Sequence, residues 1–464
     1  MTCCDLKCGL ITGTVLGALI AVLGGILIPV GNMLIKNTVH KETVLENGTL
    51  AFETWTSVDI AIHRQFWLFD VQNADDVVSQ GAKPVLVQKG PYTYKTRFIP
   101  KKNITFNDNY TVSFVLPAGA IFEPSMSVGT EEDIFTTLNL AVAGVYSLLG
   151  HKFANLLIQR SNSSLFQNRT VKELLWGYKD PMLGSILGVF YPYNDTFDGP
   201  YTVFTGKDDI NKVATIERWQ GETSLSYWND SYCNKINGTD GSSFHPFLDK
   251  KEPLFFFVSD ICRSISAEYE GTVDLKGIDV YRYVLPPEAL ASPAENPDNQ
   301  CFCTDPVITK NCTMAGLLDL TACRGQSPVY ISLPHFLYGS KDLVQGVIGL
   351  NPNFDEHSIF MDVEPITGFT MRFAKRLQLN MLYGPSDSIV ILNKIKDYTI
   401  FPILWVNETA GLDDETADLF KKELIGRMEL LEGFQIGLIV VGLILFASCL
   451  IGLIVVFCRT RGLG

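Results

Sequence analysis

The stretch GLITGTVLGALIAVLGGILIPVGNMLI, residues 9–35, contains no charged residue and decides the architecture of this 464-residue chain. A second uncharged apolar stretch, FQIGLIVVGLILFASCLIGLIVVF, covers residues 434–457. About 20 apolar residues are enough for a helix to cross the hydrocarbon core of a bilayer, so each stretch predicts a transmembrane helix. A cleaved signal peptide is the alternative for the first stretch, but its apolar run is longer than a signal core and no clear cleavage site follows it.

Glycosylation sequons indicate which side of the membrane the central region faces. All ten N-x-S/T sequons lie between the two apolar stretches, and sequons are modified only in the secretory lumen. We therefore predict a cytoplasmic tail (1–8), a span (9–35), an extracellular region (36–433), a second span (434–457) and a cytoplasmic tail (458–464) at the plasma membrane. The expected acceptors are Asn47, Asn103, Asn109, Asn162, Asn168, Asn194, Asn229, Asn237, Asn311 and Asn407.

The eleven cysteines divide in the same way. Six lie in the extracellular region, where an even number predicts three disulfides. A zinc site is the competing interpretation, but no histidine lies close to them in the sequence. Cys301 and Cys303 are too close to pair comfortably with each other, so each is expected to bond elsewhere. The six are Cys233, Cys262, Cys301, Cys303, Cys312 and Cys323.

The remaining cysteines lie beside or inside the apolar stretches. Thiols next to a span on the cytosolic side are candidates for S-palmitoylation, and free reduced thiols are the alternative. We expect acylation at Cys3, Cys4, Cys8 and Cys458, with lipid rafts and the Golgi as further expected locations. Cys449 is expected to be a small apolar residue within the second span.

Small residues recur at every fourth position along the first span, which is a signal for close helix association. The partner is either the second span of the same chain or another copy, which would make a homo-oligomer. The small residues are Gly9, Gly13, Gly17, Ala21 and Gly25.

Short apolar and alternating runs dominate the extracellular region, and such runs predict half-buried strands. Residues 130–160 instead predict a helix, with Thr130 and Asp133 as a capping box at its start. Its apolar residues recur at three- and four-residue spacing and are expected to pack in the core; they are Phe135, Leu138, Val142, Val145, Leu149 and Leu156. A second helix is expected at 171–177. A last helix is expected from about residue 413 into the second span. The predicted strands are 64–70, 85–87, 92–98, 111–115, 201–204, 280–284, 329–333, 371–379 and 400–405.

These elements predict an α+β membrane protein with a large antiparallel, β-barrel-like ectodomain, a helical region at about 130–180 and two transmembrane helices. The net charge of −13 argues against nucleic acid as a partner. No nucleophile motif, phosphate-binding loop or metal-ligand spacing is present, and the Glu356–His357 pair is interpreted as a solvated surface turn. We therefore expect a binding or transport protein, not an enzyme, with no cofactor and no metal.

Several long and specific runs occur along nearly the whole chain: RQFWLFDVQN (64–73), QKGPYTYKTRF (88–98), ENPDNQCFCTD (295–305), VYISLPHFLYGS (329–340) and DVEPITGFTMRFAKRLQ (362–378). In these runs the chain resembles the class B scavenger receptors, most closely the fatty-acid translocase (platelet glycoprotein IV) type. The resemblance implies an irregular antiparallel β-barrel with an apical helical bundle, pierced by a hydrophobic lipid tunnel. It also implies the disulfides Cys233–Cys301, Cys262–Cys323 and Cys303–Cys312.

The function that the resemblance implies is the capture and uptake of lipids. The expected partners are long-chain fatty acids, oxidised and native lipoproteins, anionic phospholipids and thrombospondin-like matrix proteins. Each buried methylene of a lipid chain is worth about 0.8 kcal/mol, so such a chain needs a dry path to the bilayer. An adhesion or signalling receptor that binds matrix protein without moving lipid is the alternative.

The chain departs from the family pattern at the apex and in its C-terminal tail. The apical loop LIQRSN (157–162) is shorter and lacks the family's lysines, so Lys152 and Arg160 are the nearest candidates for binding an anionic ligand; ordinary solvated charges are the alternative. The tail RTRGLG (459–464) lacks an acidic dileucine-like lysosomal signal, which favours the plasma membrane, and has no lysine for ubiquitination.

Overall fold

The computed structural model describes residues 3–56, 62–97, 100–304, 310, 312–325 and 327–461. The chain forms two compact units. The first comprises Met1–Glu42, Lys276–Ile278 and Asp413–Gly464, and the second comprises Thr43–Leu275 and Asp279–Leu412.

Two long helices make up most of the first unit. Helix α1 (Cys3–Thr43) contains the first apolar stretch, and α10 (Gly426–Arg461) contains the second. Both helices are long and apolar enough to cross a membrane. Before α10, α9 (Asp414–Phe420) and a π-helical turn (Lys421–Ile425) continue the helical path, and the Asp413 carboxylate caps α9 by accepting the Thr416 N–H at 2.7 Å. The expected helix from residue 413 into the second span is therefore present.

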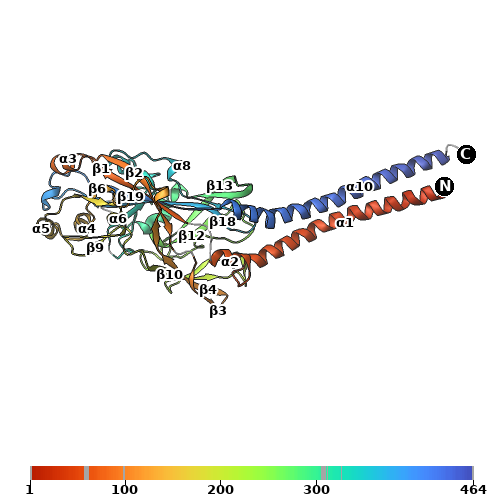
Figure 1. Cartoon of the computed structure of the whole chain (residues 1–464), viewed down its shortest axis with the longest axis horizontal. Coiled ribbons are helices and arrows are strands. Elements are labelled where there is room, and N and C mark those ends of the chain that lie inside the picture. Colours follow the sequence, from red (N-terminus) through yellow and green to blue (C-terminus); the bar gives the residue numbers. More distant parts are fainter. Residues whose placement is uncertain are drawn as a thin grey trace. The chain divides into compact units, whose positions relative to one another are not determined.

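Helices α1 and α10 lie side by side with their chain ends at the same end of the pair (Figure 1). Their backbones touch near the middle, because a Cβ added to Gly17 would lie 2.5 Å from the Phe446 nitrogen, and one added to Gly442 would lie 2.4 Å from the Ala21 nitrogen. Only residues without a large side chain allow so close an approach.

Near the other end of the pair, the Gln435 side-chain amide donates a hydrogen bond of 2.9 Å to the Leu27 carbonyl. The second span of the same chain is thus a partner of the small-residue face. The face differs from the predicted one, because a Cβ at Gly9 or Gly25 would meet nothing within 4 Å, whereas Gly24 and Gly31 make close contacts with α10.

The second unit is built on a large antiparallel sheet, whose described pairing does not close into a ring. Strand β18 pairs with β19 along almost its whole length, and β1 pairs with β19 on the other side. The sheet order is β12 (Leu254–Val258), β13 (Arg263–Leu275), β14 (Ile278–Val284), β17 (Phe360–Val363), β18 (Thr370–Tyr383), β19 (Thr399–Gly411), β1 (His63–Val71), β2 (Leu86–Thr96) and β5 (Ala120–Phe122), with β16 (Val329–Ser332) on β18 and β15 (Leu318–Asp319) on β16.

The described residues form three smaller sheets as well. The largest has the order β11 (Ile216–Trp219), β10 (Thr196–Phe204), β4 (Thr111–Ala118) and β3 (Lys102–Asn107), and the others are the pairs β6 (Ile134–Leu138) with β7 (Phe166–Thr170) and β8 (Tyr178–Lys179) with β9 (Ile186–Leu187). Every strand predicted from the sequence overlaps an observed one. The predicted strands 85–87 and 92–98 both fall on β2, although residues 98 and 99 lie outside the described part.

Short helices decorate the sheets. Helices α4 (Leu140–Leu148), α5 (His151–Ser161) and α6 (Val171–Trp176) lie near one end of the sheet (Figure 1). Thr170 and Glu173 form a capping box at α6, where a helix was predicted. The other helices are α2 (Leu50–Thr56), α3 (Ala74–Gln80), α7 (Lys341–Gln345) and α8 (Phe354–His357), with 3₁₀ turns that include Pro287–Leu290, Pro297–Phe302 and Val390–Leu392.

The predicted helix start at Thr130 is wrong. Residues 134–138 form β6, which pairs with β7, and the Thr130 hydroxyl bonds the Asp133 carboxylate in a turn before that strand. The sequence IFTTL contains three β-branched residues, which favour a strand, and the helix begins only after the Asn139 cap. Leu138 still packs in the core, as do Phe135, Val142 and Val145.

Two clusters of charged side chains within the large sheet are paired. The Lys375 ammonium lies 2.8 Å from Asp260 and 3.3 Å from Glu408, and Glu408 also accepts a bond from the Arg64 guanidinium. The positive charge of Lys375 lowers the pKa of the Asp260 carboxyl well below its usual range. Asp362, which is fully buried, binds the two arginines Arg282 and Arg372. These pairs connect β1, β14, β17, β18 and β19.

Two buried histidines stack beside the central strands. The rings of His335 and His357 lie 4.4 Å apart and nearly parallel, and the Nδ1 atoms accept backbone N–H bonds from Asn351 and Asn353 at 2.9 and 3.0 Å. The interpretation of Glu356–His357 as a solvated turn is wrong for His357, which is 2% exposed. Burial lowers the pKa of His335 to about 3 and that of His357 to about 4.

The packing of the spans predicts a specific cross-link. A Cβ at position 13 would lie 2.5 Å from the Cys449 sulfur, so the Gly13→Cys variant should form a disulfide with Cys449 under mild oxidation in membranes. Mass spectrometry of the linked peptides measures it. Gly25→Cys is the matched control, since nothing lies within 4 Å of that Cβ, and equal linkage to Cys449 from both positions would contradict the packing.

The histidine pair predicts a pH dependence of stability. The folded-state pKa values lie below the unfolded value of about 6.5, so the unfolded state binds more protons between about pH 6.5 and 4, and stability falls as pH decreases through this range. Thermal unfolding of the full chain between pH 7.5 and 4.5 measures the effect. The His335→Gln/His357→Gln variant should show a shallower slope, even if it is less stable at every pH; an unchanged slope argues against the pair.

Candidate binding face on helix α5

Helix α5 is held in place through one side. At its first residue, the His151 Nδ1 lies 2.9 Å from the Ser386 hydroxyl, and the Asn155 side-chain carbonyl accepts the Val390 N–H at 3.0 Å. Ala154 and Ile158 on the same side are buried. Because residues three and four apart share a helix face, the opposite side of α5 is left to solvent.

Four residues on that opposite side form what we call the α5 stripe: Lys152, Phe153, Leu156 and Arg160. Lys152, Leu156 and Arg160 follow each other at four-residue spacing, and Phe153 lies three residues before Leu156. Phe153 is 55% exposed and Leu156 is 57% exposed. Neither Lys152 nor Arg160 forms an ion pair with a described residue.

This combination of exposed apolar and cationic side chains is typical of a contact surface. Isolated exposed apolar residues are ordinary, but two adjacent large ones between two free cations can bind an amphipathic anion, with its charge on the cations and its chain on the apolar residues. Leu148, just before α5, is also 48% exposed. The sequence pointed to Lys152 and Arg160, and the structure places both on one face.

The apolar part of the stripe was misassigned from the sequence. Leu156 was expected in the core stripe with Phe135 and Val142, but α5 is a separate helix after the Gly150 break, so the register of that stripe does not continue through it. Phe153 was not singled out. A helix with its own phase starting at His151 would have placed both residues on the solvent side.

Three disulfides join the cysteine-rich segment of the second unit. They are Cys233–Cys301, Cys262–Cys323 and Cys303–Cys312, with Cα–Cα distances of 6.0, 6.4 and 5.9 Å. This is the pairing that the resemblance implies. Bonded cysteines do not serve as zinc ligands, and among the described residues no cluster of three or more histidine, cysteine, aspartate or glutamate side chains could hold a metal ion.

Comparison with known proteins adds the family. The CD36 family model matches residues 15–453. The chain belongs to the CD36 family. It is 36% identical to lysosome membrane protein 2 of Rattus norvegicus over 83% of this chain and 82% of that protein. It is 33% identical to scavenger receptor class B member 1 of Cricetulus griseus over 92% of this chain and 86% of that protein, so this CD36 family member is a class B scavenger receptor.

The predicted modification sites of this CD36 family member lie on different surfaces. The side chains of Cys8 and Cys458 are exposed, Cys449 is partly covered between the spans, and the side chains of Cys3 and Cys4 lie outside the described part. Palmitoylation therefore stays a prediction for Cys3, Cys4, Cys8 and Cys458. Eight sequon asparagines are exposed: Asn47, Asn103, Asn109, Asn162, Asn168, Asn194, Asn229 and Asn237.

The sequons at Asn311 and Asn407 differ from the eight exposed ones. Asn311 lies outside the described residues. Asn407 is only 9% exposed in the centre of β19, between β1 and β18, and its side-chain amide donates to Gln65 at 3.0 Å. A glycan on Asn407 would have to replace this contact and displace the side chains that cover Asn407 on that face of the sheet, so we no longer expect it in the folded protein.

The fraction of each sequon asparagine that carries a glycan, measured on protein that has passed through the secretory pathway, tests these assignments. Peptide mass spectrometry after enzymatic deglycosylation in heavy-oxygen water should label the exposed asparagines and leave Asn407 unlabelled, because the Asn407 side chain is buried. The Asn407→Gln variant should keep the electrophoretic mobility of the wild type, whereas Asn162→Gln should migrate faster. A labelled Asn407 would contradict the burial of its side chain.

Proposed function

We propose that this chain is a cell-surface scavenger receptor that binds long-chain fatty acids, oxidised and native lipoproteins and anionic phospholipids, and assists lipid uptake. Membership of the CD36 family and two helices able to span a membrane support a membrane receptor, not an enzyme. The proposed class of ligand rests on the α5 stripe, in which the cations Lys152 and Arg160 flank two exposed apolar side chains, Phe153 and Leu156.

The charges and the apolar area of the α5 stripe are suited to a weak contact with a large lipid surface. Exposed ion pairs contribute only about 0–1 kcal/mol each and are screened by salt, so two cations alone would discriminate little. Covering the apolar area of Phe153 and Leu156 adds about 25 cal/mol per Å² removed from water. Anionic surfaces that also offer acyl chains would therefore bind better than purely ionic ones.

Transfer of lipid after capture would require an apolar path through the ectodomain. The hydrophobic tunnel that the resemblance implies remains a prediction. A paired set of helices at the chain ends would keep the ectodomain at the bilayer surface, where a captured chain can re-enter hydrocarbon. The plasma membrane is the proposed location, with both tails cytoplasmic, and the two helices able to span a membrane support a membrane location.

Variants of the stripe test the proposal. Lys152→Gln/Arg160→Gln and Phe153→Ser/Leu156→Ser should each reduce binding of oxidised lipoprotein to expressing cells by about three- to tenfold, because each removes one of the two contributions to binding. Fluorescent lipoprotein binding and labelled fatty-acid uptake are the measurements. Gln159→Ala, an exposed position on the same helix, is the matched control.

Salt dependence separates the two contributions. Wild-type binding should weaken as ionic strength rises from about 50 to 300 mM, and the charge variant should lose most of this dependence. Full binding and uptake by both double variants, at wild-type surface expression, would overturn the role of the α5 stripe. Binding of thrombospondin with no lipid retained by the purified chain would instead favour an adhesion receptor.

A further inference from the structure

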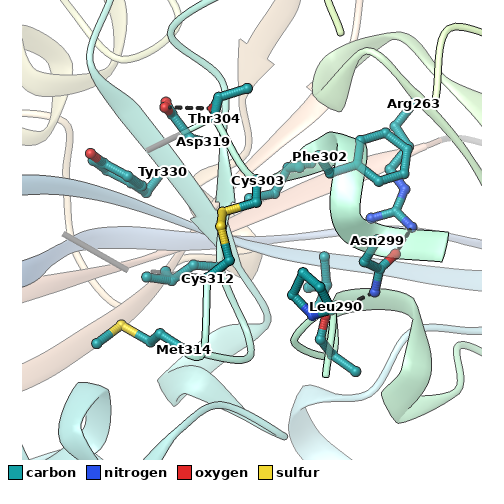
Figure 2. Close-up of a pocket in the computed structure, with 14 residues that line it drawn as sticks. Arg263, Leu290, Asn299, Phe302, Cys303, Thr304, Cys312, Met314, Asp319 and Tyr330 are labelled. Atoms are coloured by element: carbon teal, nitrogen blue, oxygen red, sulfur yellow. Dashed lines mark hydrogen bonds between the residues drawn. A yellow bond between two sulfur atoms is a disulfide. The ribbon is translucent and has the colours of Figure 1, made fainter. Parts of the chain in front are cut away.

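Arg263, the first residue of β13, is a buried cation with few partners. It is 8% exposed, and its described hydrogen bond is a single one of 2.8 Å from Nη2 to the Asn299 side-chain oxygen (Figure 2). Among the residues that the structure describes, its buried Nε has no hydrogen-bond partner and no carboxylate lies within 4.0 Å of the guanidinium. It therefore differs from Arg282 and Lys375, whose charges meet carboxylates directly.

The surroundings hold the guanidinium but do not neutralise it. The Phe302 ring lies 3.7 Å from its central carbon, and the Asn299 amide nitrogen is already committed to the carbonyls of Glu288 and Ala291. Burial lowers the pKa of Arg263 to about 10, so the group remains charged at neutral pH. An uncompensated buried charge is destabilising, and a positioned anion would remove that cost.

Space for an anion is present beside this group. Arg263, Asn299 and Phe302 line two cavities. The smaller, drawn in Figure 2, has a volume of about 40 Å³ and is suited to water. The larger has a volume of about 330 Å³, which falls within the range of small-molecule sites.

The positive and negative side chains that line the larger cavity differ in how deeply they are buried. The buried group is the cation Arg263, whereas the exposed lining residues include three carboxylates, Glu268, Glu288 and Asp298, and one cation, Lys235. A simple anion would gain from Arg263 but would be repelled by the excess negative charge near the opening. A simple cation would be attracted near the opening and repelled inside.

We propose that the larger cavity binds a compact zwitterion, with its phosphate or carboxylate on Arg263 and its ammonium group among the exposed carboxylates. A guanidinium with unpaired N–H groups suits a planar or tetrahedral oxyanion because it donates several hydrogen bonds at once. The exposed ring of Phe255 in the lining offers a further contact for the ammonium group. The site uses no residue of the α5 stripe, so it stands or fails independently of the proposed function.

One molecule and its two halves test the proposal. O-phosphoethanolamine carries both charges, inorganic phosphate carries only the anion, and ethanolamine carries only the cation. Isothermal titration calorimetry with the full glycosylated chain in a maltoside detergent should show that O-phosphoethanolamine binds at least about tenfold more tightly than either half, because it alone satisfies both ends. Glycerophosphoethanolamine distinguishes a lipid headgroup from a free metabolite, since a diester that binds more tightly identifies the headgroup as the source.

Two variants locate the binding. Arg263→Met keeps the stem against Phe302 and should abolish measurable binding of both phosphate compounds. Glu268→Gln/Glu288→Gln, at exposed positions where folding is expected to be unaffected, should weaken O-phosphoethanolamine by about three- to tenfold while strengthening inorganic phosphate. Arg218→Met, an exposed arginine outside the cavity lining, is the control.

Clear outcomes would overturn the proposal. Absence of O-phosphoethanolamine binding at millimolar concentration does so, as does equal binding of inorganic phosphate and O-phosphoethanolamine. If Arg263→Met fails to reach the cell surface, the double carboxylate variant still decides, because a structural role for Arg263 alone predicts no change in ligand preference when the exposed carboxylates are neutralised.

Discussion

A charge placed inside the ectodomain is costly unless it meets an opposite charge, and two charge clusters of the large sheet satisfy that requirement. Lys375 on β18 meets Asp260 and Glu408, while Asp362 on β17 meets Arg282 and Arg372. Asp362 is fully buried, and leaving such a charge unpaired typically costs about 3–5 kcal/mol, so its two arginines favour the pairing of β17 with β14 and β18. The Asp260 side chain is 55% exposed, and its contact with Lys375 contributes less. The register of β18 on β19 follows from these contacts together with the apolar core.

The same rule explains why the two candidate binding regions differ. On α5, Lys152 and Arg160 lie in water, where a charge needs no partner, so they are free to meet a passing anionic surface. Arg263 lies in the interior, where its charge is unsatisfied by described carboxylates. The first arrangement favours weak, salt-sensitive contact with large particles, and the second favours a small ligand that fits a defined volume.

Local patterns in the sequence predicted much of the fold but not its long-range register. Alternating runs located the strands, and the uncharged stretches located α1 and α10, because both signals depend only on neighbouring residues. Residues 134–138 were misassigned, since pairing with β7 overrode an apolar spacing that also fits a helix. Arg263 and the stacked His335–His357 pair were missed, because burial brought about by distant strands leaves no local mark.

The two spans show how small residues direct association toward a particular partner. A glycine face gains stability through close backbone contact, and in this chain α10 covers that face. Gly9 and Gly25 lie outside this contact, because a Cβ added at either position would meet nothing within 4 Å. These two glycines offer another chain only a short, interrupted surface. Gln435, by donating to the Leu27 carbonyl, adds a directional bond where few alternatives exist in hydrocarbon. Pairing within one chain therefore uses the small-residue face of α1, and a homo-oligomer through the spans stays a prediction.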